Sequence, residues 1–285
     1  MPRVSIQGNA IHYETAGSHG PAVVLVMGVR ARGLGWLPII DRLQEDHRLV
    51  WFDHRGVGES DPVSGRLDMS DMAADVAGLM DHLGWESAHI VGVSMGGMVS
   101  QRFALDHRER VRSLSLLVTA ACGRQVLRLP LKTATIWLRT TFGSRDSRLS
   151  ALGSLLYSQR YLERVGIAAE MERLTLAFGQ DQPGTVRAQI AAMLRHDVRS
   201  HLGDLSELPV LVLGARRDRL VRIGLVEELA KGISGAQMHR FQEAGHGVIS
   251  ECADEVAELL RHQVADADRA WEPTERQLWS LEGTT

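Results

Sequence analysis

The chain has 285 residues, of which 44% are hydrophobic and 24% are charged, the composition of an ordinary globular protein. The formal net charge of −3 excludes the overall basic field that nucleic acid binding requires. The longest apolar run, over residues 22–29, is far shorter than the roughly 18 residues of a membrane span. We therefore expect no nucleic acid partner and no membrane span. The first residues predict a strand and lack a signal-peptide layout, so a cytoplasmic location is expected.

The first 121 residues alternate between strand-like and helix-like runs. Alternating apolar residues at 4–6 and 11–14 predict a hairpin that turns at Gly8-Asn9. The continuous apolar run at 22–27 is typical of a strand buried on both faces. Further strands are predicted at 48–53, 88–91 and 114–118, and helices at 34–45, 70–84 and 97–105. Ser70 is the expected cap of the helix at 70–84.

This alternation stops at Cys122 and resumes near residue 206. No strand is expected between these points, and helices are predicted at 126–141, 148–157, 168–178 and 186–195. After the interruption, strands are predicted at 210–214 and 238–241 and helices at 224–231 and 250–262, the last capped by Ser250. A polar tail is expected to follow.

This order predicts an α/β fold with a mainly parallel, eight-stranded, doubly wound sheet and an inserted all-helical cap. The predicted boundaries are 1–121 and 206–265 for the core, 122–205 for the cap and 266–285 for the tail. The cap is expected over the carboxyl ends of the strands, where sites form in open α/β sheets.

The segment Gly92-Val93-Ser94-Met95-Gly96 lies between a predicted strand and a predicted helix. A G-x-S-x-G sequence in this position is typical of a sharp turn that exposes a nucleophilic serine. Glycines flank the serine because so tight a backbone leaves no room for side chains. Ser94 is therefore the candidate nucleophile, and a glycine-rich turn with a bystander serine is the alternative.

A serine hydroxyl needs a neighbouring base and an acid that orients this base. Asp218 follows the predicted strand at 210–214, and His246, between two glycines, follows the last predicted strand. Ser, then Asp, then His is the chain order of α/β-hydrolase catalytic triads. Glu243 and Asp204 are weaker substitutes for Asp218.

An oxyanion intermediate needs two N–H donors. The first is expected from Met95, at the start of the helix that follows the nucleophile, where the helix dipole helps. The second is expected from Val29, in the loop after the strand at 22–27, although a plain strand-to-helix loop is the alternative.

Taken with this triad, residues 3–264 resemble the α/β-hydrolase superfamily. The family segment Asp-x-Arg-Gly-x-Gly-x-Ser is matched by residues 53–60, in which the resemblance implies structural roles for His54 and Arg55. Where the family often has His-Gly before the oxyanion residue, this chain has Met27-Gly28. That variant, together with Gly35-Trp36, resembles the anthracycline methylesterase branch. The serine nucleophile argues against the dehalogenase and epoxide hydrolase branches, which use aspartate.

Substrate pockets are mostly apolar. The side chains predicted to bind substrate are Trp36, Met98, Trp137, Leu220, Val221 and Val248, with core packing as the alternative for Met98 and Trp137. The first part of the predicted cap carries six basic residues against one acidic residue, Asp146. A solvated helix face is the ordinary explanation of these charges, and attraction of an acidic substrate or an anionic surface is the alternative.

These features predict a serine hydrolase that cleaves a small carboxylic ester or lactone without a cofactor. No metal-binding, P-loop or dinucleotide motif is present, and Cys122 and Cys252 are expected to be free thiols, with one disulfide as the alternative. Hydrolysis of a carbon–carbon bond, as in meta-cleavage-product hydrolases, and a ligand receptor built on the same fold are the two other hypotheses. A homodimer is left open.

Overall fold

A computed structural model describes residues 2–126, 128, 130–140, 142, 144–178, 182 and 184–271. In this part of the chain, eight strands form one sheet in the order β1-β2-β4-β3-β5-β6-β7-β8. The pairs β1–β2 and β2–β4 are antiparallel and the other neighbours are parallel, which confirms the predicted, mainly parallel sheet. The strands are β1 (Arg3–Ile6), β2 (Asn9–Ala16), β3 (Ala22–Val26), β4 (Arg48–Phe52), β5 (Ala88–Val93), β6 (Val111–Leu117), β7 (Val210–Ala215) and β8 (Gln237–Phe241).

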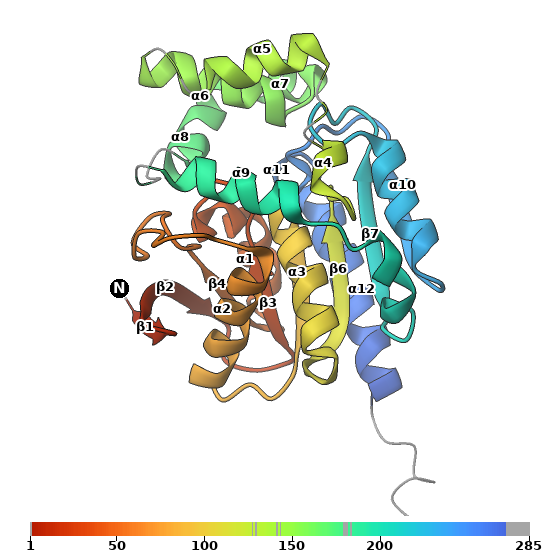
Figure 1. Ribbon diagram of the computed structural model, residues 1–285. Coiled ribbons are helices and arrows are strands. Elements are labelled where there is room, and N and C mark those ends of the chain that lie inside the picture. Colours follow the sequence, from red (N-terminus) through yellow and green to blue (C-terminus); the bar gives the residue numbers. More distant parts are fainter. Residues whose placement is uncertain are drawn as a thin grey trace, which may run out of the picture.

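Helices cover both faces of the sheet because its central strands are apolar on both sides. One apolar core packs beneath α2 (Met69–His82), α3 (Met95–Asp106) and α10 (Ile223–Gly232), which lie in front in Figure 1. The second core packs beneath α1 (Leu37–Leu43), α11 (Val248–Glu251) and α12 (Ala253–Trp271) on the opposite face. The short helices η1 (Gly33–Trp36), η2 (Arg108–Arg110) and η3 (Arg199–Leu205) complete these layers.

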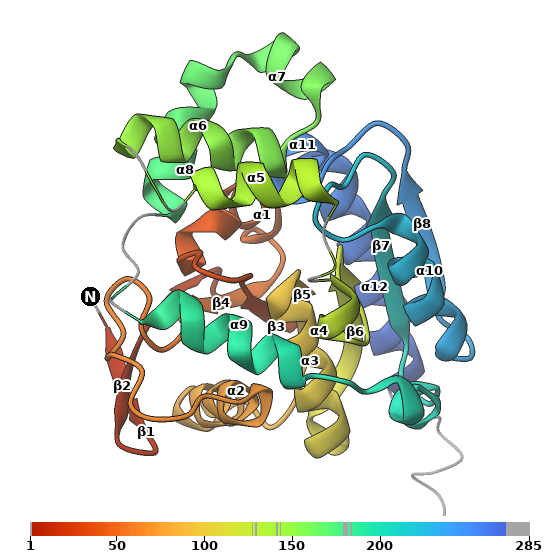
Figure 2. The same cartoon turned by 45° about the horizontal axis from the view of Figure 1, so that its top comes forward.

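Between β6 and β7 the chain forms a helical insertion, defined here as α4 to α9. Its helices are α4 (Gly123–Val126), α5 (Leu131–Arg139), α6 (Arg145–Leu156), α7 (Gln159–Val165), α8 (Ile167–Ala177) and α9 (Thr185–Arg195). Figures 1 and 2 show α5 to α8 together above one end of the sheet, with α9 crossing between them and the core. A small apolar cluster that contains Leu149, Tyr157, Tyr161 and Leu174 holds α6, α7 and α8 together.

The ends of the insertion meet. Cys122 and Asp197 form an antiparallel bridge. The N–H of Gly123 donates to the carbonyl of His196, and the N–H of Val198 donates to Ala121. The chain thus enters and leaves the insertion at one neck, where its two crossings lie side by side.

Several helix ends differ from the predicted ones, because local capping and one proline set them. The first turn of α2 is capped by Asp68, whose carboxylate accepts the N–H of Asp71 while its own N–H donates to the Asp71 carboxylate at 2.7 Å, so the predicted cap at Ser70 is wrong. Within the stretch 126–141 predicted as one helix, α4 ends at Val126 and α5 begins only at Leu131, directly after Pro130, because a proline ring is incompatible with a helix interior.

The C-terminal helix also differs from its prediction. Ser250 lies inside α11 and does not cap a helix, and α12 continues to Trp271, where a tail was predicted from residue 266. The rest of the predicted tail, 272–285, lies outside the described residues. Cys122 and Cys252 are both free, as predicted. In the described part of the chain, no helix is both long and apolar enough to cross a membrane.

Candidate active site

Ser94 lies on a strained turn between β5 and α3. Its φ of 57° and ψ of −120° fall outside the regions that residues with a side chain favour. A Cβ on Gly96 would lie 2.1 Å from the Val26 carbonyl oxygen, and one on Gly92 would lie 2.4 Å from the Gly96 carbonyl oxygen. Both glycines are therefore required by the close approach of backbone segments, as the sequence pattern predicts.

His246 and Asp218 are brought together from the loops after β8 and β7. The distance between His246 Nδ1 and Asp218 Oδ2 is 2.7 Å, and the carboxylate side chain is fully buried. The N–H groups of Leu220 and Val221 donate to Asp218 Oδ1 at 2.7 and 2.9 Å. Since the carboxylate accepts the hydrogen bond, Nδ1 carries the proton and Nε2 is left as the basic nitrogen of the imidazole.

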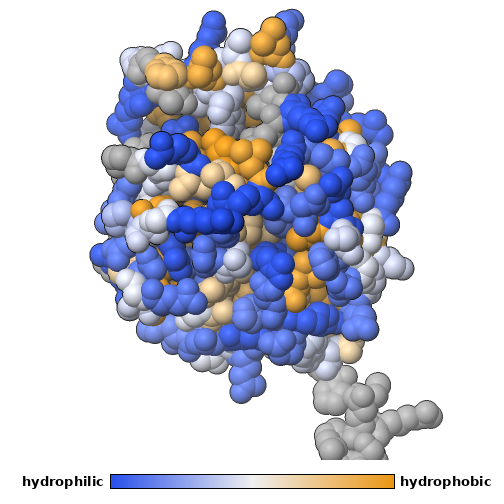
Figure 3. All heavy atoms as spheres, in the orientation of Figure 1, coloured by the Kyte–Doolittle hydropathy of each residue, from blue (hydrophilic) through white to orange (hydrophobic). Residues whose placement is uncertain are grey.

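Ser94 and His246 line the same cavity, of about 530 Å³, between the carboxyl ends of the strands and the helical insertion. The wall on the side of the sheet includes Gly28 and Val29. The wall on the side of the insertion is mostly apolar and includes Val126, Trp137, Leu152, Leu156, Leu174, Ile190 and Met193. Figure 3 shows an apolar area on the surface between α9 and the helices above it. This cavity can hold a largely apolar small molecule beside Ser94.

The two N–H groups predicted to bind an oxyanion lie close to Ser94. Met95 follows it as the first residue of α3, and a Cβ on Gly28, which precedes Val29, would lie 3.2 Å from Ser94 Cβ. Within the described residues, neither the N–H of Val29 nor that of Met95 donates a hydrogen bond to the protein. Both groups are therefore available to a ligand, although their role stays a prediction.

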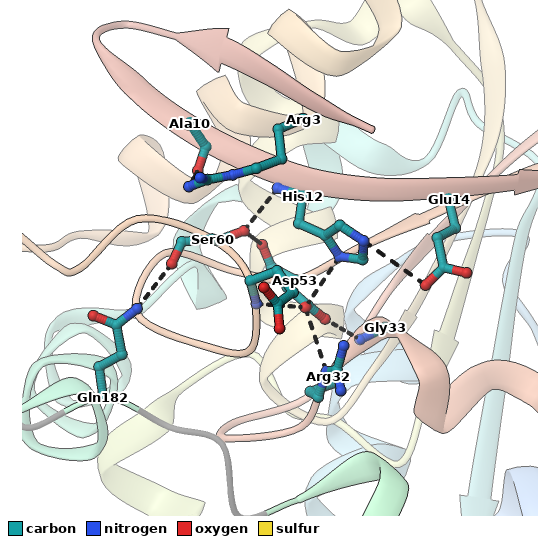
Figure 4. A network of polar contacts seen from close by, with 10 residues as sticks. Arg3, Ala10, His12, Glu14, Arg32, Gly33, Asp53, Ser60 and Gln182 are labelled. Atoms are coloured by element: carbon teal, nitrogen blue, oxygen red, sulfur yellow. Dashed lines mark hydrogen bonds and ion pairs between the residues drawn. The ribbon is translucent and has the colours of Figure 1, made fainter. Parts of the chain in front are cut away.

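The loop after Val29 is held by a buried carboxylate, shown in Figure 4. Asp53 Oδ1 accepts the N–H of Gly33 at 2.8 Å. Asp53 Oδ2 lies 3.2 Å from His12 Nδ1 and 3.5 Å from Arg32 Nε. Ser60 Oγ donates to the main-chain carbonyl of Asp53 at 2.6 Å. These contacts fix the chain just beyond Val29 and give the Asp-x-Arg-Gly-x-Gly-x-Ser segment a structural task.

His54 and Arg55 have structural surroundings, as the sequence predicts. His54 is fully buried, and its Nε2–H donates to the Met27 carbonyl at 2.9 Å. Burial lowers the pKa of His54, so this imidazole is neutral. Arg55 makes two hydrogen bonds to the buried carboxylate of Asp75, at 2.7 and 2.8 Å. Neither side chain belongs to the cavity wall.

The structure divides the six side chains predicted to bind substrate into two groups. Three of them line the cavity: Trp137, Leu220 and Val221. The other three are fully buried core residues and their predicted contact with substrate is corrected: Trp36, Met98 and Val248. They lie next to predicted site segments along the chain, but each belongs to one of the two apolar cores between the sheet and its covering helices.

Two polar residues near the site were not predicted. Glu251, on α11, accepts the N–H of Gly245 at 2.9 Å and the N–H and hydroxyl of Ser158 at 2.9 and 2.5 Å. It thereby joins the loop that carries His246 to the insertion. Gln189 is fully buried on α9 and accepts the N–H of Arg30 at 2.9 Å. The available signals were a glutamate five residues after His246 and a glutamine on an apolar helix face.

Among the described residues, no group of three or more His, Cys, Asp or Glu side chains is arranged to hold a metal ion.

Residues 21–251 match the model of the alpha/beta hydrolase fold family, and the chain belongs to this family. A protein of Azorhizobium caulinodans provisionally named carbamate hydrolase RutD is 29% identical over 253 residues, covering 88% of this chain and 93% of that protein. The 2-hydroxy-6-oxo-6-phenylhexa-2,4-dienoate hydrolase of Comamonas testosteroni is 29% identical over 263 residues, covering 87% and 89% of the two chains.

Solved structures agree with this assignment. The enol-lactonase from Burkholderia xenovorans superposes with a TM-score of 0.80 at 25% identity, covering 93% of this chain and all of that one. A thermophilic esterase from Thermogutta terrifontis superposes with a TM-score of 0.79 at 26% identity, covering 94% and 99%. Hydrolysis is the class of activity that these relatives support.

Proposed function

We propose that the protein is a serine hydrolase of small carboxylic esters or lactones that works through an acyl-enzyme intermediate. The observation that carries the proposal is the 2.7 Å contact between His246 and buried Asp218 in the wall of the cavity that also contains the strained Ser94. A buried acid that orients an imidazole beside an exposed serine is the arrangement that acyl transfer requires.

Each step of the proposed reaction is assigned to a named residue. Ser94 Oγ attacks the carbonyl carbon while His246 Nε2 takes the hydroxyl proton, and the N–H groups of Val29 and Met95 bind the developing oxyanion. His246 then gives the proton to the leaving alcohol, and the acyl group stays on Ser94. A water molecule, deprotonated by His246, attacks the acyl-enzyme, and the acid is released as His246 returns the proton to Ser94 Oγ. Asp218 holds the imidazole in one tautomer and stabilises its charged form.

The helical insertion is proposed to act as a cap that excludes water from the reaction. Its helices supply the apolar wall opposite Ser94. The neck at Cys122 and Asp197 separates it from η3, which packs against α3 and α10. We therefore place the end of the cap near residue 198, before the boundary at 205 that the sequence predicts. A cytoplasmic location and a homodimer remain predictions from the sequence.

Hydrolysis of p-nitrophenyl butyrate tests the proposal. Ser94→Ala should lower kcat by about 10⁴-fold or more with an unchanged melting temperature, and Asp218→Asn should cause a loss of similar order. The second variant keeps the shape of the side chain and removes its charge. Turnover by Ser94→Ala at the wild-type rate would exclude Ser94 as the nucleophile.

Cleavage of a carbon–carbon bond is the second candidate, because the sequence match to a dienoate hydrolase of Comamonas testosteroni covers 87% of this chain. The same serine and histidine would act on a vinylogous diketone in place of an ester. Comparing kcat/KM for a ring-fission dienoate and for p-nitrophenyl butyrate separates the two activities. A value at least tenfold higher for the dienoate would favour the second candidate.

A further inference from the structure

The outer side of α5 exposes apolar side chains to solvent. Leu131 and Leu138 are 83% and 57% exposed, and Phe142, just beyond the helix, is 66% exposed. The two leucines are seven residues apart, so they lie on the same side of the helix. The opposite side is occupied, because Thr133 is buried and Trp137 lines the cavity. The exposed leucines are therefore a second, outward-facing apolar stripe of this helix.

Five basic side chains lie on α5 or close to it along the chain, between positions 128 and 148. All five of them are exposed: Arg128, Lys132, Arg139, Arg145 and Arg148. Lys132 and Arg139 again are seven residues apart, and they lie beside the leucines on the exposed arc of α5. The ion pairs formed among the described residues include none of the five. Asp146 is the one acidic residue between positions 122 and 150, in a chain whose net charge is −3.

We propose that this surface, formed by Leu131, Leu138 and Phe142 with Lys132 and Arg139 beside the leucines, docks on an anionic phospholipid bilayer. An apolar stripe edged by Lys and Arg is the pattern of helices that lie in a membrane interface. The apolar side chains would enter the acyl boundary while the cations meet lipid phosphates. The rest of the chain carries a net negative charge. The anionic bilayer would therefore repel it and orient α5 toward the lipid.

The charges favour a bilayer over a second copy of the chain. In a twofold dimer through α5, the same patch would face itself and bring Lys132 and Arg139 of the two copies together. An anionic bilayer supplies an apolar phase and negative charge at adjoining depths, which matches the order of side chains around the helix. With three apolar side chains, the interaction should be reversible and should need both the apolar and the charged contribution.

Vesicle flotation with the full-length protein tests this proposal. The protein should float with vesicles of phosphatidylcholine and phosphatidylglycerol, should not float with phosphatidylcholine alone, and should be released by 0.5 M salt, roughly the concentration that shortens the screening length below 5 Å. The double variants Leu131→Gln/Leu138→Gln and Lys132→Glu/Arg139→Glu should each lower the partition coefficient by about tenfold or more. Circular dichroism verifies that both variants are folded.

Two matched variants serve as controls. Leu194→Gln changes a leucine of α9 that is 41% exposed, and Lys231→Glu reverses an exposed charge on α10. Both should float like the wild type. Absence of flotation with anionic vesicles would overturn the proposal, as would equal losses in the control variants. A concentration-dependent dimer in sedimentation velocity that Leu131→Gln/Leu138→Gln dissociates, without vesicle binding, would assign the surface to a second copy and also overturn it. None of these results depends on the esterase activity.

Discussion

Replacement of Glu251 should loosen the loop that carries His246. Its carboxylate accepts three hydrogen bonds, from the N–H of Gly245, the N–H of Ser158 and the Ser158 hydroxyl. On the other side of the same loop, the N–H of Gly247 donates to the Leu156 carbonyl at 2.7 Å. Glu251→Ala removes the acceptor from two main-chain donors and one hydroxyl. An unpaired buried donor costs about 1–3 kcal/mol, and since Glu251 is only partly buried, we expect a total loss of about 2–4 kcal/mol of unfolding free energy.

Glu251→Gln is the matched control. Its amide oxygen can accept the same two N–H groups, and its NH₂ can donate to the Ser158 hydroxyl oxygen. The unfolding free energy should therefore fall by about 1 kcal/mol or less. Ser158→Ala removes one of the three hydrogen bonds and should also cost about 1 kcal/mol.

Urea unfolding and ester kinetics together test this reasoning. With the variants fully folded at the assay temperature, kcat/KM of Glu251→Ala should fall by about 10–100-fold, because Gly245 is the neighbour of His246, while Glu251→Gln should stay within about threefold of the wild type. An alanine variant as stable as the wild type would refute the hydrogen-bond argument. A destabilised alanine variant with unchanged kcat/KM would refute the positioning of His246.

Two further predictions concern the turn at Gly96 and the buried imidazole of His196. Gly96→Ala places a Cβ 2.1 Å from the Val26 carbonyl oxygen and should unfold the turn or lower the melting temperature by 10 °C or more, roughly 3 kcal/mol, whereas Gly224→Ala, in open space on α10, should be neutral or stabilising. Burial lowers the pKa of His196 to about 4, so protons bind the unfolded chain first and stability should fall as pH drops from about 6.5 to 4. In His196→Gln, the loss of unfolding free energy between these pH values should be smaller by up to about 3 kcal/mol. An unchanged slope would contradict the assignment of this pH dependence to His196.

The order of elements and the candidate nucleophile follow from local sequence. Apolar runs of strand length, helical periodicity and glycine positions act over a few residues, so the eight strands and the turn at Ser94 could be predicted. The pairing of Asp218 with His246 was also within reach, because parallel strands bring their carboxyl ends to one edge of a sheet. Helix ends were harder to predict from the sequence, since Asp68 and Ser70, two residues apart, are both suitable caps.

Only the tertiary structure decided which side chains surround the candidate site. Trp36 and Val248 precede or follow site segments in the chain, yet packing turns them into the core, while Trp137 reaches the cavity from the insertion. Glu251 acquires its role through Ser158, which is 93 residues away. Such contacts depend on where the insertion lies above the sheet. That placement is set by packing between segments distant along the chain, and local sequence patterns carry no signal of it.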